Sequence, residues 1–181
     1  MKKAIRVCSV LCIALLLVGI MSCGNVSGAD SSEPDVWTKV TNLDDLKGTW
    51  EGSQTMTKEV VDGVIASIKG TTKVQYPVTE DDVPGLKMTL ITDMTDYVEK
   101  FAKVIEGSAD AFWQEMKNEM QEEDVEFSDG RPYTMASASF IPEDNILTSL
   151  TEGGVALFVN QSKTKLKIDY GDGDVVILNK K

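Results

Sequence analysis

The spacing of the apolar residues changes twice along this chain, and the two changes limit the folds that it can adopt. Between residues 49 and 92, apolar and polar residues alternate, as is typical of half-buried β-strands. From about residue 92 to 123 the apolar residues recur every three or four positions, which indicates one face of an α-helix. Short alternating runs return after residue 133. The pattern predicts a mainly β domain with a helical segment inserted between two groups of strands.

The strands before the helix are expected at residues 49–57, 71–78 and 86–92. Between the first two, Asp62 and Gly63 separate two apolar pairs, which is the strongest short signal for a β-hairpin. An amphipathic helix over residues 60–65 is the alternative at this point. The later strands are expected between turn-forming residues, at 133–141, 146–151, 155–160, 165–170 and 175–179. This spacing predicts an antiparallel meander of about eight strands that closes into a barrel.

The inserted segment at about 92–123 presents an apolar stripe opposite a charged face, and Gly107 and Ser108 predict a kink or a break in its middle. One interpretation is that the stripe packs on the barrel as ordinary core. A second makes it a hinged cover over an apolar cavity, and a third an exposed patch for a partner. The candidate ligand-binding residues on this stripe are Phe101, Phe112, Trp113, Met116 and Met120.

The first 22 residues have the layout of an export signal. Lys2, Lys3 and Arg6 form a positive start, and residues 10–20 are apolar but too few to span a bilayer. The stretch ends in an aliphatic residue, a variable residue, a small residue and then Cys23. This ending resembles the lipobox of bacterial lipoproteins, in which the cysteine receives a palmitate-containing lipid.

The resemblance implies that residues 1–22 are a lipoprotein signal peptide and that lipidated Cys23 anchors the protein to a bacterial membrane. The anchored protein would then face the periplasm or the cell surface. A secretory signal with a chance cysteine, or an uncleaved anchor, are the alternatives. Residues 23–36 are small and polar, so they are expected to form a flexible tether. The domain is expected at residues 37–181.

Composition excludes several kinds of chemistry. The sequence contains no histidine, which excludes serine–histidine and cysteine–histidine catalysis as well as histidine-based zinc sites. The three cysteines lie within residues 1–23, so the domain has neither a disulfide nor a thiol nucleophile. Without residues 1–22, 15 basic residues face 29 acidic ones. This balance disfavours both nucleic acid and anionic membrane surfaces as partners, because both repel an acidic protein.

Two segments resemble lipocalins and their bacterial lipocalin-like relatives. Gly48-Thr49-Trp50 is similar to the opening strand of that family, in which the tryptophan closes one end of the barrel. Residues 162–180 are similar to the closing hairpins of small exported lipocalin-like lipoproteins. The resemblance implies a lipocalin-like β-barrel with Trp50 as a structural plug. It also implies room for one small apolar or amphipathic ligand.

We therefore expect a membrane-anchored lipoprotein that binds such a ligand without catalysing a reaction. The alternative is a structural or interaction lipoprotein whose outer surface contacts another envelope or host protein. No pair of acids is singled out as catalytic, and no cofactor or metal is expected. Asp169, Asp172 and Asp174 fit a hairpin turn better than a calcium loop. The acidic run at residues 122–126 is expected to be solvated, with a weak divalent-cation site as its alternative.

Overall fold

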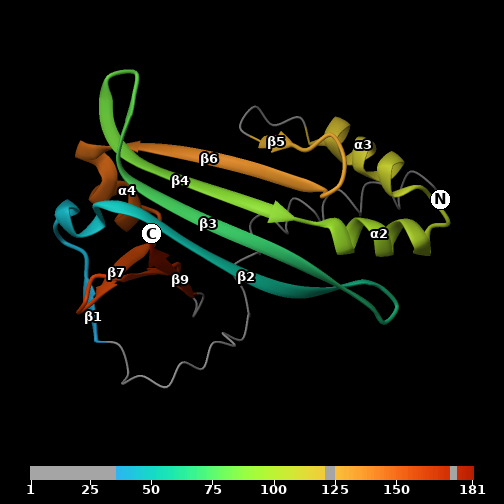
Figure 1. Cartoon of the computed structure of the whole chain (residues 1–181), viewed down its shortest axis with the longest axis horizontal. Helices are drawn as coiled ribbons and strands as arrows, with labels where there is room; N and C mark the ends of the chain where they lie inside the picture. The colour runs from blue at the N-terminus through green and yellow to red at the C-terminus, as the bar shows by residue number, and fades with distance from the viewer. Residues whose placement is uncertain (1–35, 121–124, 172–174) are drawn as a thin grey trace.

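The computed structural model describes residues 36–120, 125–171 and 175–181. Its strands form one antiparallel sheet in the order β1-β7-β8-β9-β2-β3-β4-β6-β5 (Figure 1). The elements are β1 Trp37–Lys39, η1 Leu43–Leu46, β2 Gly48–Val61, β3 Val64–Glu80, β4 Val83–Asp93, α2 Thr95–Val104, α3 Ala109–Glu119, β5 Val125–Phe127, β6 Thr134–Pro142, η2 Glu143–Asn145, α4 Ile146–Glu152, β7 Ala156–Asn160, β8 Lys165–Asp169 and β9 Val175–Lys180.

The β2–β3 hairpin is the longest feature of the sheet. Its turn places Asp62 at φ 35° and Gly63 at φ 84°, the left-handed backbone that a tight hairpin turn requires. The hairpin prediction is therefore confirmed, and the alternative helix over residues 60–65 is wrong. The strands run 14 and 17 residues, so the runs expected at 49–57 and 71–78 extend to the turn.

The sheet has nine described strands, with β1 and β5 at the two ends of the strand order. β1 pairs with β7 and β5 pairs with β6, and the described part of the chain holds no pairing that joins β1 to β5. The expectation of a mainly β, antiparallel domain is confirmed. The described strands do not form the closed barrel of about eight strands that the sequence predicts, because closure requires that the two end strands pair with each other.

One face of the long strands, which we call the inner face, carries two apolar clusters. On β3, every even-numbered residue from Ala66 to Tyr76 is buried, so a single face of this strand is covered along its length. The Trp50 cluster comprises Val40, Leu46, Trp50, Val74, Tyr76, Leu86, Ile146, Leu157, Val159, Leu166, Ile168, Val176 and Leu178. The Trp113 cluster comprises Ala66, Ile68, Met94, Tyr97, Val98, Phe112, Trp113, Met116, Met120, Tyr133 and Met135.

The two clusters lie at opposite ends of the long strands. Strands β7 and β9 and helix α4 gather at one end, whereas α2 and α3 lie at the other (Figure 1). Gly52 shows how closely β9 approaches β2 at the first end, since a Cβ atom built on it would lie 2.4 Å from the carbonyl oxygen of Ile177. Only a residue without a side chain permits this backbone contact.

The helical insertion divides as the sequence predicts. α2 and α3 are separate helices, and the side chain of Ser108 caps the second by accepting a hydrogen bond of 3.4 Å from the amide of Ala111. The expected continuation from 121 to 123 lies outside the described residues.

The strand expected at 146–151 is wrong. Residues 143–145 form η2 and residues 146–152 form α4. The strands β1 and β5, of three residues each, were not expected.

Candidate functional site

The predicted aromatic stripe faces the protein interior. Phe112, Trp113, Met116 and Met120 are all less than 9% exposed, and Phe101 is half-buried. The ring of Phe101 stacks on that of Phe112, with 4.4 Å between the centroids. The structure thus brings the five candidate residues together in and beside the Trp113 cluster. They pack against the inner face of the sheet and do not form an exposed patch.

Polar contacts fix α3 to the loop that leads into β6. The indole nitrogen of Trp113 donates to the carbonyl of Ser128 at 2.9 Å, and its ring contacts that of Tyr133 at 5.5 Å. The Tyr133 hydroxyl donates to Asp110 at 2.5 Å, and this hydrogen bond, together with burial, raises the pKa of Tyr133 to about 12. Each aromatic ring therefore has a satisfied polar group at its edge, which holds the helix in one position.

Helix α2 lies beside the part of β3 that has no pairing with β4. Strand β4 ends opposite Lys69, so β3 continues toward its turn without β4 as a neighbour. There Asp96 accepts hydrogen bonds from the backbone amide of Ser67 at 2.7 Å and from its hydroxyl at 3.0 Å. Lys100 donates to the carbonyl of Ile65 and to Asp96, each at 2.8 Å. Two side chains of α2 thus satisfy the edge groups that β4 would otherwise bind.

The hydrogen bonds at Asp96 also change its acidity. The bond from Lys100 contributes most and the bond from the Ser67 amide follows, and together they lower the pKa of Asp96 to about 2. Its carboxylate therefore stays charged over a wider pH range than an ordinary aspartate.

Trp50 lies at the other end of the sheet. Its side chain is fully buried, and its indole nitrogen donates to the carbonyl of Leu46 at 2.8 Å. The amine of Lys180 lies 4.9 Å from the ring centroid. Trp50 is thus part of the packed interior where β2 meets β9, and its polar atom is used within the protein.

Between the two clusters, small and polar side chains occupy the inner face. The register pairs Gly52 with Thr72, Thr72 with Leu90, and Leu90 with Ser137, which forms one row across β2, β3, β4 and β6. None of these four residues belongs to either cluster. Thr72 is buried, whereas Gly52, Leu90 and Ser137 are half-buried. We call this row the waist.

The waist is the part of the inner face where bulky core residues are replaced by one leucine, two hydroxyl side chains and a glycine. Directly paired residues of an antiparallel sheet point to the same side, so these groups lie side by side in one row on the inner face, where the carbonyl of Ile177 packs against Gly52. Sequence reasoning missed the waist because its residues are far apart in the chain. Only the strand register, which the sequence does not state, could have revealed it.

Cys23, Glu122, Glu123, Asp124, Asp172 and Asp174 lie outside the described residues. Within residues 36–120, 125–171 and 175–181, no group of three or more acidic residues is arranged to hold a metal ion. Within the same ranges, no helix is both long enough and apolar enough to cross a membrane.

Comparisons of the chain with protein-family models, with curated proteins and with solved structures find no match. The functional interpretation of the candidate site therefore depends on the residues of this chain alone.

Proposed function

We propose that the protein is an exported lipoprotein, anchored through Cys23, whose sheet binds a small amphipathic molecule without catalysing a reaction. The observation that carries this proposal is the waist, a row of small and polar side chains between two apolar clusters. Binding sites for small molecules combine apolar walls with a few polar groups that fix orientation. The lipocalin-like resemblance of Gly48-Thr49-Trp50 supports the same class of function.

The side chains of the waist indicate the class of ligand. Leu90 offers an apolar contact, and the hydroxyls of Thr72 and Ser137 on either side of it can each donate or accept a hydrogen bond. The Trp113 cluster and the Trp50 cluster flank the row along the strands. An alkyl chain that carries a hydroxyl or carboxyl group would match this arrangement, with its apolar part on the clusters and its polar group at the waist.

The test is native mass spectrometry of the protein purified from its own host, with extraction of any bound molecule. We expect an adduct in the mass range of a lipid or fatty acid. Ser137→Phe, which fills the waist, should abolish the adduct. Thr89→Phe is the matched control, because Thr89 is half-buried on the opposite face of the neighbouring strand. A protein that stays free of ligand after fatty acids and other lipids are offered would contradict the proposal.

A second candidate is the interaction lipoprotein that contacts another envelope or host protein. One observation favours it: β9 pairs with β2 only at Trp50 and Glu51, and no other described strand lies along this edge of β2 beyond them. An unpaired strand edge can accept a strand from a partner. A photo-crosslinker at Thr57 in intact cells should then join a partner protein, whereas one at Lys73, on the central strand β3, should not. Equal crosslinking at both positions would contradict this candidate.

A further inference from the structure

The outer face of β1, β7, β8 and β9 differs in charge from the protein as a whole. The register places Lys39 opposite Phe158, Phe158 opposite Lys167, and Lys167 opposite Ile177, so these four residues form a row on one side of the sheet. Lys165 lies on the same side of β8, and Asp169 is the acidic residue on that side of this strand. In a chain with a formal net charge of −11, this face is locally basic.

Aromatic rings surround the central lysine of this row. The amine of Lys167 lies 4.1 Å from the ring centroid of Phe158 and 5.4 Å from that of Trp37. The rings hold the ammonium group by cation–π attraction and keep it beside an apolar surface. Ile177 adds a side chain that is 37% exposed. We call the set Trp37, Lys39, Phe158, Lys167 and Ile177 the aromatic–lysine face.

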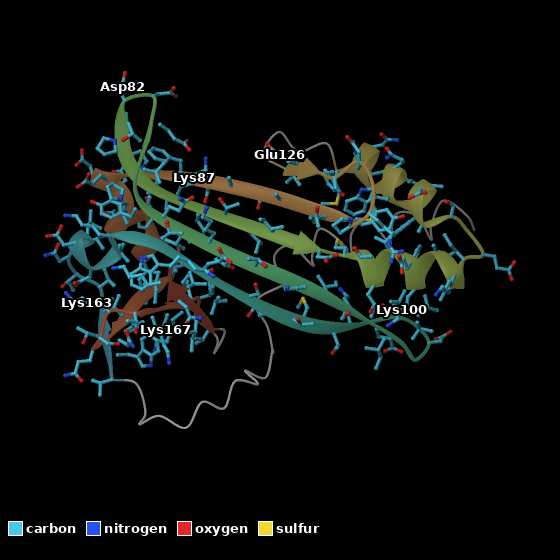
Figure 2. The ribbon with its side chains drawn as sticks, viewed as in Figure 1. Asp82, Lys87, Lys100, Glu126, Lys163 and Lys167 are labelled. Atoms are coloured by element: carbon cyan, nitrogen blue, oxygen red, sulfur yellow. The ribbon has the colours of Figure 1, made fainter. Side chains whose placement is uncertain are left out.

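The position of this face in the chain is the second observation. β1 begins at Trp37, and Cys23 precedes it by 14 residues. A flexible tether of this length spans about 20 Å on average. If Cys23 carries a lipid, as the proposed function requires, the tether therefore holds this face close to the bilayer surface. Lys167 is at the end of the molecule opposite Lys100, which marks the helical end (Figure 2).

We propose that the aromatic–lysine face docks on the surface of an anionic phospholipid bilayer. Tryptophan favours the boundary between headgroups and acyl chains, where its ring is in an apolar environment and its N–H in a polar one. Lys39 and Lys167 complement the negative headgroups. This docking depends on the lipid anchor of the proposed function and adds an orientation of the domain relative to the membrane. The docked domain directs α2 and α3 away from the membrane.

The tryptophans of the protein make this orientation measurable. Trp50 and Trp113 are 0% and 1% exposed, whereas Trp37 is half-buried at the surface. The full-length lipidated protein is reconstituted in vesicles of phosphatidylcholine and phosphatidylglycerol that carry bromine on their acyl chains. Bromine quenches only nearby indole rings, so we expect a loss of emission that disappears in Trp37→Phe.

Charge reversal separates docking from anchoring. The double variant Lys39→Glu and Lys167→Glu should lose at least half of the quenching yet still float with vesicles in a density gradient. The matched control is Lys69→Glu and Lys103→Glu, two exposed lysines at the helical end of the sheet, which should keep both properties. Flotation of the wild type without quenching of Trp37 overturns the docking and leaves the anchor intact. Salt at 0.5 M makes the Debye length shorter by on the order of threefold than at low salt, so it should weaken contacts between lysines and headgroups. Quenching that persists both in this salt and after charge reversal also overturns the docking. Failure of the wild type to float overturns the anchor and the docking together.

Discussion

The contact between α2 and the edge of β3 leads to a prediction in which the electrostatic contribution of Asp96 can be separated from packing by its pH dependence. Asp96→Asn keeps the shape of the side chain but removes the charge that Lys100 and the Ser67 amide stabilise. The folded pKa of about 2 lies below the ordinary value of 3.8 for an aspartate. This difference corresponds to about 2 kcal/mol at most. Because the Asp96 side chain is 38% exposed, solvent screening reduces the expected loss of unfolding free energy to about 1 kcal/mol at neutral pH.

The sign of the pH dependence follows from the direction of the shift. A carboxyl group whose pKa is lower in the folded state stabilises the fold at pH values above its unfolded pKa. That stabilisation disappears as the pH falls through the folded value. The difference between wild type and Asp96→Asn should therefore be full at pH 7 and about half as large at pH 3.

Denaturant unfolding followed by circular dichroism at pH 7, 5 and about 3 measures this difference. Asp129→Asn is the control, because Asp129 also pairs with a lysine, Lys117, at 3.0 Å but is fully exposed. It should leave stability unchanged. A loss for Asp96→Asn that is the same at all three pH values would refute the electrostatic reasoning, since it would have to arise from packing alone.

Three further predictions address the anchor and the Trp50 end. Cys23→Ser should abolish lipidation and release the protein from membranes, and wild-type membrane retention in a fractionation experiment would contradict the lipobox. Trp50→Ala should lower the free energy of unfolding by about 3–5 kcal/mol because the ring is fully buried, and a loss below about 1 kcal/mol would show that its packing matters little. Gly52→Ala should destabilise the protein by about 1–3 kcal/mol because the new methyl group would meet the backbone of Ile177. Gly130→Ala is the control and should not destabilise it, because the space around that position is open. Equal melting temperatures for these two variants would contradict the close approach of β9.

The sequence was most informative where local chemistry decides local structure. Asp62 and Gly63 can take up positive φ angles at little cost, so the hairpin was predictable from two residues. Gly107 and Ser108 likewise marked the division between α2 and α3. In these places the backbone conformation depends on the residues themselves rather than on distant contacts.

Short apolar runs were less informative. Residues 146–151 carry few apolar side chains, whose spacing fits a short strand and a short helix equally well. In the structure Ile146 is fully buried in the Trp50 cluster and Leu147 is 38% exposed, so the start of the helix directs Ile146 into this core. This choice depends on a core assembled from distant strands. Barrel closure and the waist depend on strand register in the same way.

The two clusters also differ in the order in which a growing chain can complete them. Every buried member of the Trp113 cluster comes from residues 66–135. The Trp50 cluster joins Val40 near the start of the domain to Leu178 near its end. Contacts between such distant residues carry a larger loop-closure cost and slow the folding rate. The helical end can therefore assemble while the C-terminal strands are still being synthesised, and the end that holds β1 beside β7 is completed last.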